Sequence, residues 1–103
     1  MSNLRLPPEE YDALCQHVLE RDRWRCRNPQ CNSRNNLHVH HITFRSQQGP
    51  DEDWNLCTLC MFCHTGIHDE VDEHGQPGLT IQTPANANEQ LIFVWAPGWR
   101  PGP

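Results

Sequence analysis

Val39-His40-His41-Ile42 places two adjacent histidines at the end of an apolar run, and a pair of cysteines lies on either side of it. The upstream pair has four residues between its members, and the downstream pair has two. Such spacings let two thiolates point at one metal ion. We therefore predict that the cysteines form a frame that holds the histidines in place. The two pairs are Cys26 with Cys31 and Cys60 with Cys63.

The length and composition favour a small domain that needs a disulfide or a metal for stability. The 103 residues fit one domain and are too few for two independent cores. Only 36% of them are hydrophobic, and the mean hydropathy is −0.78. The first residues begin no apolar signal segment, and no run approaches the roughly 20 residues of a membrane span. We therefore expect a soluble, cytoplasmic protein without a membrane partner, whose cysteines bind zinc in preference to forming disulfides.

The charge of the chain is unevenly distributed. The formal net charge of −5 argues against a protein that coats nucleic acid nonspecifically. All eight basic residues are arginine, however, and six of them lie between residues 17 and 45. Arginine suits bidentate phosphate contacts, so this segment could face a polyanion; a solvated helix end is the alternative. Candidate nucleic-acid contacts are Arg25, Arg27 and Arg45.

Periodicity and turn residues predict a small α+β chain. Prolines and acidic residues mark the start of a first helix with one apolar face. Two short strands flank a loop rich in Gln, Gly, Pro and acidic residues, and therefore pair antiparallel. On an ideal strand His40 and His41 would face opposite sides, so a shared site requires the strand to end or bend there. The expected elements are a helix over 8–22, a strand over 37–42, a surface loop over 43–54, a strand over 55–59, a helix from His64 to about 73, a hairpin of strands over 79–83 and 90–95, and a loose tail over 97–103.

The four paired cysteines form a closed set of the kind that holds structural zinc. Binding such an ion supplies roughly 10–16 kcal/mol of apparent free energy, comparable with the whole stability of a domain. We therefore expect metal-dependent folding. Cys57 is an alternative partner for Cys60 on spacing alone, but the apolar pattern of residues 56–59 favours a core position for it. Cys15, on the apolar face of the first helix, is also expected in the core.

The histidines indicate a second metal site. His40, His64 and His68 could bind an ion through three imidazoles and leave positions open for water and a phosphate oxygen. The adjacent His41, with an ordinary pKa of about 6.5, could accept a proton from water. This arrangement would hydrolyse a phosphodiester. In the alternative interpretation, His64 or His68 completes a zinc site and the other histidines lie on the surface.

The order His40-His41, Asn55, Cys60-x2-Cys63-His64 and His68 resembles that of HNH endonucleases of the ββα-metal, or His-Me finger, group, from about Val18 to Val71. The resemblance implies two short antiparallel strands and a helix around one divalent ion. The expected fold is thus a ββα-metal finger with a structural zinc on two cysteine knuckles, an N-terminal helix and a C-terminal β-hairpin. The chain departs from many members at Cys57, where they carry an aliphatic residue, and the terminal hairpin falls outside the motif.

The resemblance also implies a role for each residue. His41 would be the general base, and Asn55 would hold its imidazole in position. His40 and His64 would bind the catalytic ion, and His68 matches a further ligand of some members. The products would carry a 5′-phosphate and a 3′-hydroxyl.

We therefore expect residues 1–103 to form a single HNH nuclease domain, with its motif core at about 18–71 and its hairpin at 79–95. It would hydrolyse DNA with little sequence preference, using one structural Zn²⁺ and one catalytic divalent ion. Mg²⁺ or Mn²⁺ is expected at the catalytic site, with Ni²⁺ or Zn²⁺ as alternatives. The chain would act as a homodimer or within a larger phage or restriction machinery; a toxin or competition nuclease would share the chemistry. The rival function is a non-catalytic zinc module that binds nucleic acid or a protein.

Overall fold

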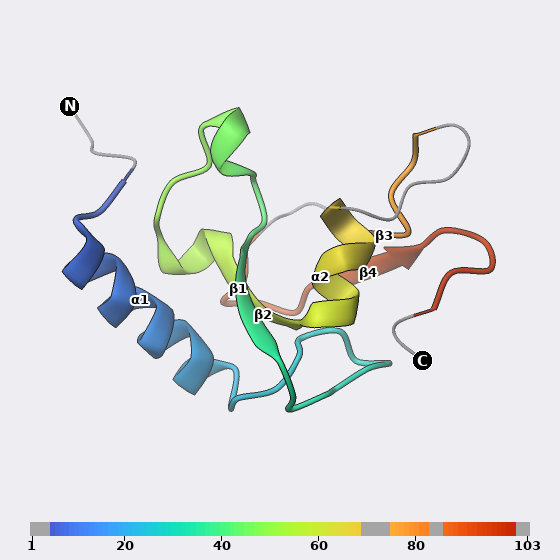
Figure 1. Cartoon of the computed structure of the whole chain (residues 1–103), viewed down its shortest axis with the longest axis horizontal. Coiled ribbons are helices and arrows are strands. Elements are labelled where there is room, and N and C mark those ends of the chain that lie inside the picture. Colours follow the sequence, from blue (N-terminus) through green and yellow to red (C-terminus); the bar gives the residue numbers. More distant parts are fainter. Residues whose placement is uncertain (1–4, 69–74, 83–85, 101–103) are drawn as a thin grey trace.

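The computed structural model describes residues 5–68, 75–82 and 86–100. Within these ranges the chain forms a small α+β fold of two α-helices, two short 3-10 helices and two antiparallel two-stranded sheets (Figure 1). The expected α+β class and the order of its elements are therefore confirmed. In chain order the elements are α1 (Pro8–Arg21), β1 (Leu37–His41), η1 (Arg45–Gln47), η2 (Asp53–Asn55), β2 (Leu56–Cys60), α2 (Met61–His68), β3 (Leu79–Gln82) and β4 (Ile92–Trp95).

Helix α1 begins and ends where the sequence predicts. Pro8 lies in the first turn, where its missing N–H has no intrahelical partner to lose. Glu9 and Glu10 in the first turn and Arg21 in the last turn complement the helix dipole. Val18 is fully buried, and the helix contacts β1 and β2. Helix α1 thus covers one side of the first sheet.

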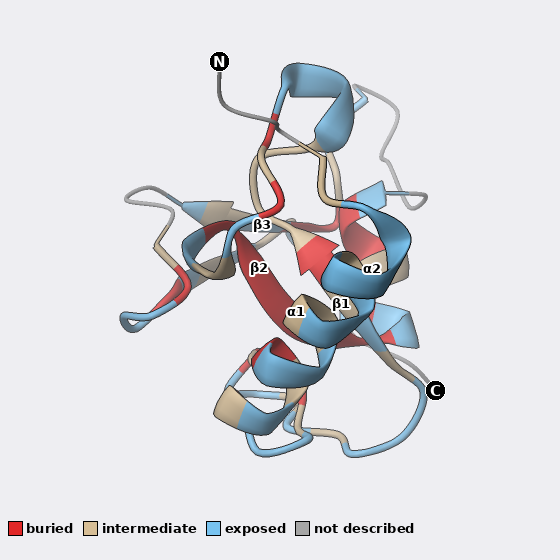
Figure 2. Ribbon diagram, turned by 90° about the vertical axis from the view of Figure 1, so that its left-hand side faces the viewer, coloured by how far each residue is buried: buried red, intermediate tan, exposed pale blue. Residues whose placement is uncertain are grey.

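Strand β2 is the centre of the structure. All five of its residues are buried, as the red strand in Figure 2 shows, which explains its nearly continuous apolar sequence. It pairs antiparallel with β1, so that His40 lies opposite Cys57 and His41 opposite Leu56. Cys57 is fully buried and packs within the hydrophobic core, which confirms its expected core position. The strand leads directly into α2 at Met61, three residues before the helix start expected at His64.

The expected C-terminal hairpin is confirmed, and it packs onto the rest of the fold. Leu79 lies opposite Trp95 and Ile81 opposite Phe93 across the β3–β4 pair. These four side chains contact the hydrophobic core, whereas Ile92 on the other face is 53% exposed. Strand β3 also contacts α2. One core therefore extends from β2 through α2 into the hairpin.

The expected loose tail is wrong for the segment after β4 up to Trp99, which packs against the core. The Trp99 amide donates to the Ala96 carbonyl at 3.0 Å, and its indole packs against the core beside Trp95, with ring centroids 5.3 Å apart. Gly66 in α2 and Gly78 before β3 make room for the indole, because neither carries a side chain. The expected extension of α2 to about 73 and the chain beyond Arg100 lie outside the described residues.

The contact with Trp99 reverses the usual effect of a glycine in a helix. Gly→Ala in a helix interior ordinarily stabilises by about 1 kcal/mol. In Gly66→Ala, however, the new Cβ would overlap the indole of Trp99. We expect this substitution to destabilise the protein by about 1–3 kcal/mol, measured by urea unfolding. In a Trp99→Ala background the same substitution should be neutral or stabilising, and an equal loss in both backgrounds would contradict the proposed contact.

Among the helices of the described ranges, none has the length and apolar character that crossing a membrane requires.

Candidate metal centres and active site

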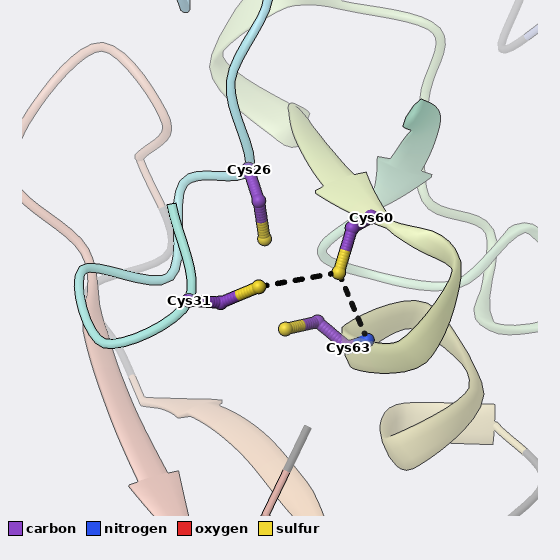
Figure 3. Close-up of side chains that lie close together, drawn as sticks. All are labelled: Cys26, Cys31, Cys60 and Cys63. Atoms are coloured by element: carbon purple, nitrogen blue, oxygen red, sulfur yellow. Dashed lines mark hydrogen bonds between the residues drawn. The ribbon is translucent and has the colours of Figure 1, made fainter. Parts of the chain in front are cut away.

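The four cysteines of the two pairs lie together, as Figure 3 shows. Cys26 and Cys31 come from the loop after α1, Cys60 ends β2, and Cys63 lies in the first turn of α2. All four sulfurs lie within 4.8 Å of one another, and none is in a disulfide. Four thiolates around zinc, at about 2.3 Å from the ion, would be roughly 3.8 Å apart. The group therefore fits a tetrahedral ion such as zinc, and Cys57 is not a member of it.

Backbone contacts bring the loop of the first pair to the second. The Arg27 amide donates to the Thr58 carbonyl at 2.8 Å, and the Cys26 amide to the Ser33 carbonyl at 2.7 Å. The first bond joins the loop to β2, and the second closes the loop on itself. The two cysteine pairs are thus brought together by tertiary contacts on β2, beyond what their spacing alone provides.

Hydrogen bonds around the sulfurs favour a thiolate at Cys26. The Asn28 amide group donates to Cys63 Sγ at 3.4 Å, and the Cys63 amide lies 3.5 Å from Cys60 Sγ. A hydrogen bond from the Cys63 thiol, with further bonds from the amides of Cys60 and Asn28, lowers the pKa of Cys26 to about 6, although burial opposes this change. Burial raises the pKa of Cys57 and of Cys31, and the hydrogen bond with Cys26 raises the pKa of Cys63. Cys57 therefore differs from the group by the position of its sulfur, which lies outside the cluster.

Three histidines form the second group. His40 is buried on β1, whereas His64 and His68 lie four residues apart on α2. Their ligand nitrogens lie within 4.8 Å of one another, and His40 Nδ1 is 3.2 Å from His68 Nε2. Two imidazole nitrogens bound to one ion at about 2.1 Å would be roughly 3.0–3.4 Å apart. Burial, with the neighbouring His64 and His68, lowers the pKa of His40 to about 3, so its imidazole is neutral and able to bind an ion.

His41 opens onto the same space as two of these histidines. Strand β1 ends at His41, and a cavity of about 270 Å³ is lined by His41, His64 and His68, together with Tyr11 and Arg45. Burial lowers the pKa of His41, and the hydrogen bond with Asp51 opposes this effect. His41 thus shares this cavity with His64 and His68, where β1 ends beside α2, whereas His40 does not line it. A neutral His41 could therefore act as a base beside an ion bound by His64 and His68.

Asp51 is a site residue that the sequence did not single out. Its side chain is 1% exposed, and Oδ1 lies 2.8 Å from His41 Nε2. Burial opposes its ionisation, but hydrogen bonds from His41 and the Leu6 amide outweigh burial and lower the pKa of Asp51. The sequence predicted that Asp51 lies in an acidic surface loop, and no sequence pattern distinguishes it from the neighbouring Glu52 and Asp53.

Asn55 contacts backbone groups and not the His41 imidazole. Its oxygen accepts from the Thr43 amide at 2.8 Å, and its nitrogen donates to the carbonyls of Thr43 at 3.1 Å and Pro50 at 3.0 Å. Asn55 is fully buried and fastens both ends of the loop between His41 and Asp51. Any effect of Asn55 on the His41 imidazole therefore passes through this loop, and its role in positioning the base stays a prediction.

The three candidate arginines differ in their surroundings. Arg27 donates to Asp22 at 2.8 Å and to the carbonyls of Ala87 and Glu89, so its guanidinium serves the fold and is an unsuitable phosphate contact. Arg45 is exposed beside the cavity and lies over the Tyr11 ring at 4.7 Å. Arg25 lies in the turn before Cys26, and its role as a contact stays a prediction.

A small α+β fold with a four-cysteine group and a three-histidine group defines a candidate metal-binding protein. Residues 24–70 match the family model described as HNH endonuclease. The resemblance found in the sequence is thereby confirmed, and the match suggests nuclease activity. No curated protein and no solved structure matches the chain significantly.

Proposed function

We propose that this chain is a metal-dependent endonuclease that hydrolyses DNA phosphodiester bonds. Residues 1–103 would form one HNH nuclease domain whose ββα-metal finger consists of β1, β2 and α2. The observation that carries the proposal is the cavity shared by His41, His64 and His68 within the segment that matches the family. The four-cysteine group would hold a structural Zn²⁺, and His40, His64 and His68 would hold the catalytic ion.

The chemistry would divide between the three-histidine group and His41. A divalent ion on the three imidazoles would supply positive charge to the phosphate and to the leaving 3′-oxygen. His41 would accept a proton from a water molecule whose oxygen attacks phosphorus, and the bond from phosphorus to the 3′-oxygen would break. The leaving 3′-oxygen would take a proton from solvent water, and the products would be a 5′-phosphate and a 3′-hydroxyl. Arg45, exposed at the same cavity, would contact a phosphate oxygen.

The rival function, a zinc module without catalysis, accounts for the cysteines and the arginine-rich segment. It gives no joint role to three clustered imidazoles beside the pair of His41 and the buried Asp51. With a net charge of −5, the chain is expected to bind DNA weakly and with little sequence preference, so that a dimer or a larger machinery would supply additional affinity. Plasmid nicking with Mg²⁺ or Mn²⁺, measured with and without chelator, tests the nuclease function directly. Protein that carries zinc but nicks no plasmid with either ion, nor with Ni²⁺, would favour the module.

Loss of one imidazole should separate the two metal sites. Mutating even an outer partner of a metal ligand typically weakens binding about 10–100-fold, so His64→Ala should weaken Mn²⁺ binding at least that much. Zinc content should not change, because His64 does not belong to the four-cysteine group. Calorimetric Mn²⁺ titration of zinc-loaded protein measures the first, and elemental analysis the second. His17→Ala, on the exposed surface of α1, is the matched control; unchanged Mn²⁺ affinity in His64→Ala would remove His64 from the ligand set.

A further inference from the structure

We infer that Asp51 is the positioning residue of the general base: it holds His41 in the tautomer that carries its proton on Nε2 and leaves Nδ1 to accept the proton from water. The inference rests on the proposed function, because it concerns the base of that reaction. It also assigns a role to residues before the HNH-matched segment, which hold Asp51 in place.

The hydrogen bond between the two side chains decides the tautomer. An ionised carboxylate only accepts hydrogen bonds, so the 2.8 Å contact with Asp51 Oδ1 requires a proton on His41 Nε2. Arg45 Nε lies 3.4 Å from the same nitrogen, but a nitrogen that already carries a proton has no lone pair with which to accept. The shorter, charge-assisted contact therefore prevails. In a neutral imidazole, Nδ1 is then the nitrogen with a free lone pair.

Arg5 and Leu6, just before α1, hold the Asp51 carboxylate in place. The Leu6 amide donates to Asp51 Oδ2 at 3.1 Å, and Arg5 Nη1 donates to Oδ1 at 3.1 Å. Arg5 also donates to the carbonyls of Gly49 at 2.6 Å and Arg45 at 3.1 Å, which ties Arg5 to two points of the loop before Asp51. Together with the Arg45 guanidinium, these donors keep a nearly inaccessible carboxylate ionised and in one orientation.

Tyr11 fixes the plane of the imidazole. Its ring is stacked on His41, with centroids 6.0 Å apart and an angle of 14° between the planes. Tyr11 and the two donors Arg5 and Leu6 all precede residue 24, where the family match begins. The environment of the base is thus completed by residues outside that match.

A purely structural ion pair would not need an imidazole at this position. Asp51 would be neutralised by Arg5 and Arg45 alone. Its shortest contact is nevertheless with His41, which lines the cavity that His64 and His68 also border. A carboxylate that fixes the tautomer of a catalytic histidine can contribute up to about 10⁴-fold in rate, as in serine proteases.

The tautomer of His41 can be measured without any activity. In ¹⁵N-labelled, zinc-loaded protein, two-bond nitrogen–proton NMR correlations should show the Nε2–H form of His41 in the wild type. Asp51→Asn should lose this fixed form, because an amide can also donate to Nε2. Glu52→Gln removes the neighbouring exposed carboxylate and should leave the tautomer unchanged. A wild-type His41 with its proton on Nδ1 would overturn the inference, whether or not Asp51→Asn folds.

Nicking kinetics give the second measurement. Asp51→Asn should lower kcat on the order of 10²–10⁴-fold with little change in KM, and Glu52→Gln should change neither. In a His41→Ala background, Asp51→Asn should cause no further loss, since it acts through that imidazole; an equal loss in both backgrounds would contradict it. Wild-type protein that nicks DNA with none of the ions would refute the proposed function, and the tautomer would still report on Asp51.

Discussion

Replacing His41 by alanine is expected to lower the rate of plasmid nicking by about 10²–10⁴-fold while zinc content and Mn²⁺ affinity remain those of the wild type. The rate falls because Arg45, the other described side chain that both contacts Asp51 and lines the cavity of His64 and His68, is a cation that cannot accept a proton. The metal groups remain because His41 belongs to neither. Nicking at saturating Mg²⁺ or Mn²⁺, elemental analysis and metal titration test the three parts separately.

The fold should survive this substitution. Asp51 keeps its bonds from Arg5 and the Leu6 amide, so alanine at position 41 does not leave a buried carboxylate without partners. The stacking contact with Tyr11 is lost, and we expect Tm to fall by only a few degrees, about 1 kcal/mol or less. His17→Ala, on the exposed side of α1, should nick at the wild-type rate. Undiminished nicking by pure His41→Ala protein would show that His41 is not the base.

Periodicity and ligand spacing predicted the parts of the fold that depend on local sequence. The apolar run around Cys57 is a buried strand, so that its thiol lies in the core and Cys60 is the member of the sulfur group. The four-residue interval between His64 and His68 places both on one face of α2, as expected for a helix. The start of α2 was wrong because Cys60-x2-Cys63 indicated a turn, whereas the helix already begins within it at Met61.

The missed features all depend on contacts between segments distant in the chain. The buried Asp51 carboxylate accepts hydrogen bonds from Arg5 and the Leu6 amide, which lie more than forty residues before it in the chain. Trp99 looked like part of a Pro- and Gly-rich tail, but its indole fits over two glycines that carry no distinctive signal themselves. A hydrophobic pattern indicates that a residue is buried, but it does not specify the partner, and an acidic run predicts exposure unless donors converge on it.

Cysteine replacement is expected to have the largest effect on stability. Cys60→Ala removes one sulfur of the group and leaves three thiolates without a closed tetrahedral site. Structural zinc contributes roughly 10–16 kcal/mol of apparent free energy, which exceeds or equals the 5–15 kcal/mol stability of typical domains. We therefore expect Cys60→Ala to lose zinc and to be unfolded at 25 °C, as wild-type protein should be after prolonged chelation. Elemental analysis and circular dichroism measure the two effects.

Cys57→Ala is the matched control, because the same chemical change is made three residues earlier on the same buried strand. Cys57 is as deeply buried as Cys60 but lies outside the sulfur group, and burial raises the pKa of its thiol. Its replacement leaves a small cavity and is expected to cost about 1–2 kcal/mol, within the usual range for core truncation. Zinc should remain at one equivalent per chain, and melting should stay cooperative. If Cys57→Ala instead loses zinc while Cys60→Ala retains it, Cys57 is the ligand and the separation between frame and core on β2 is reversed.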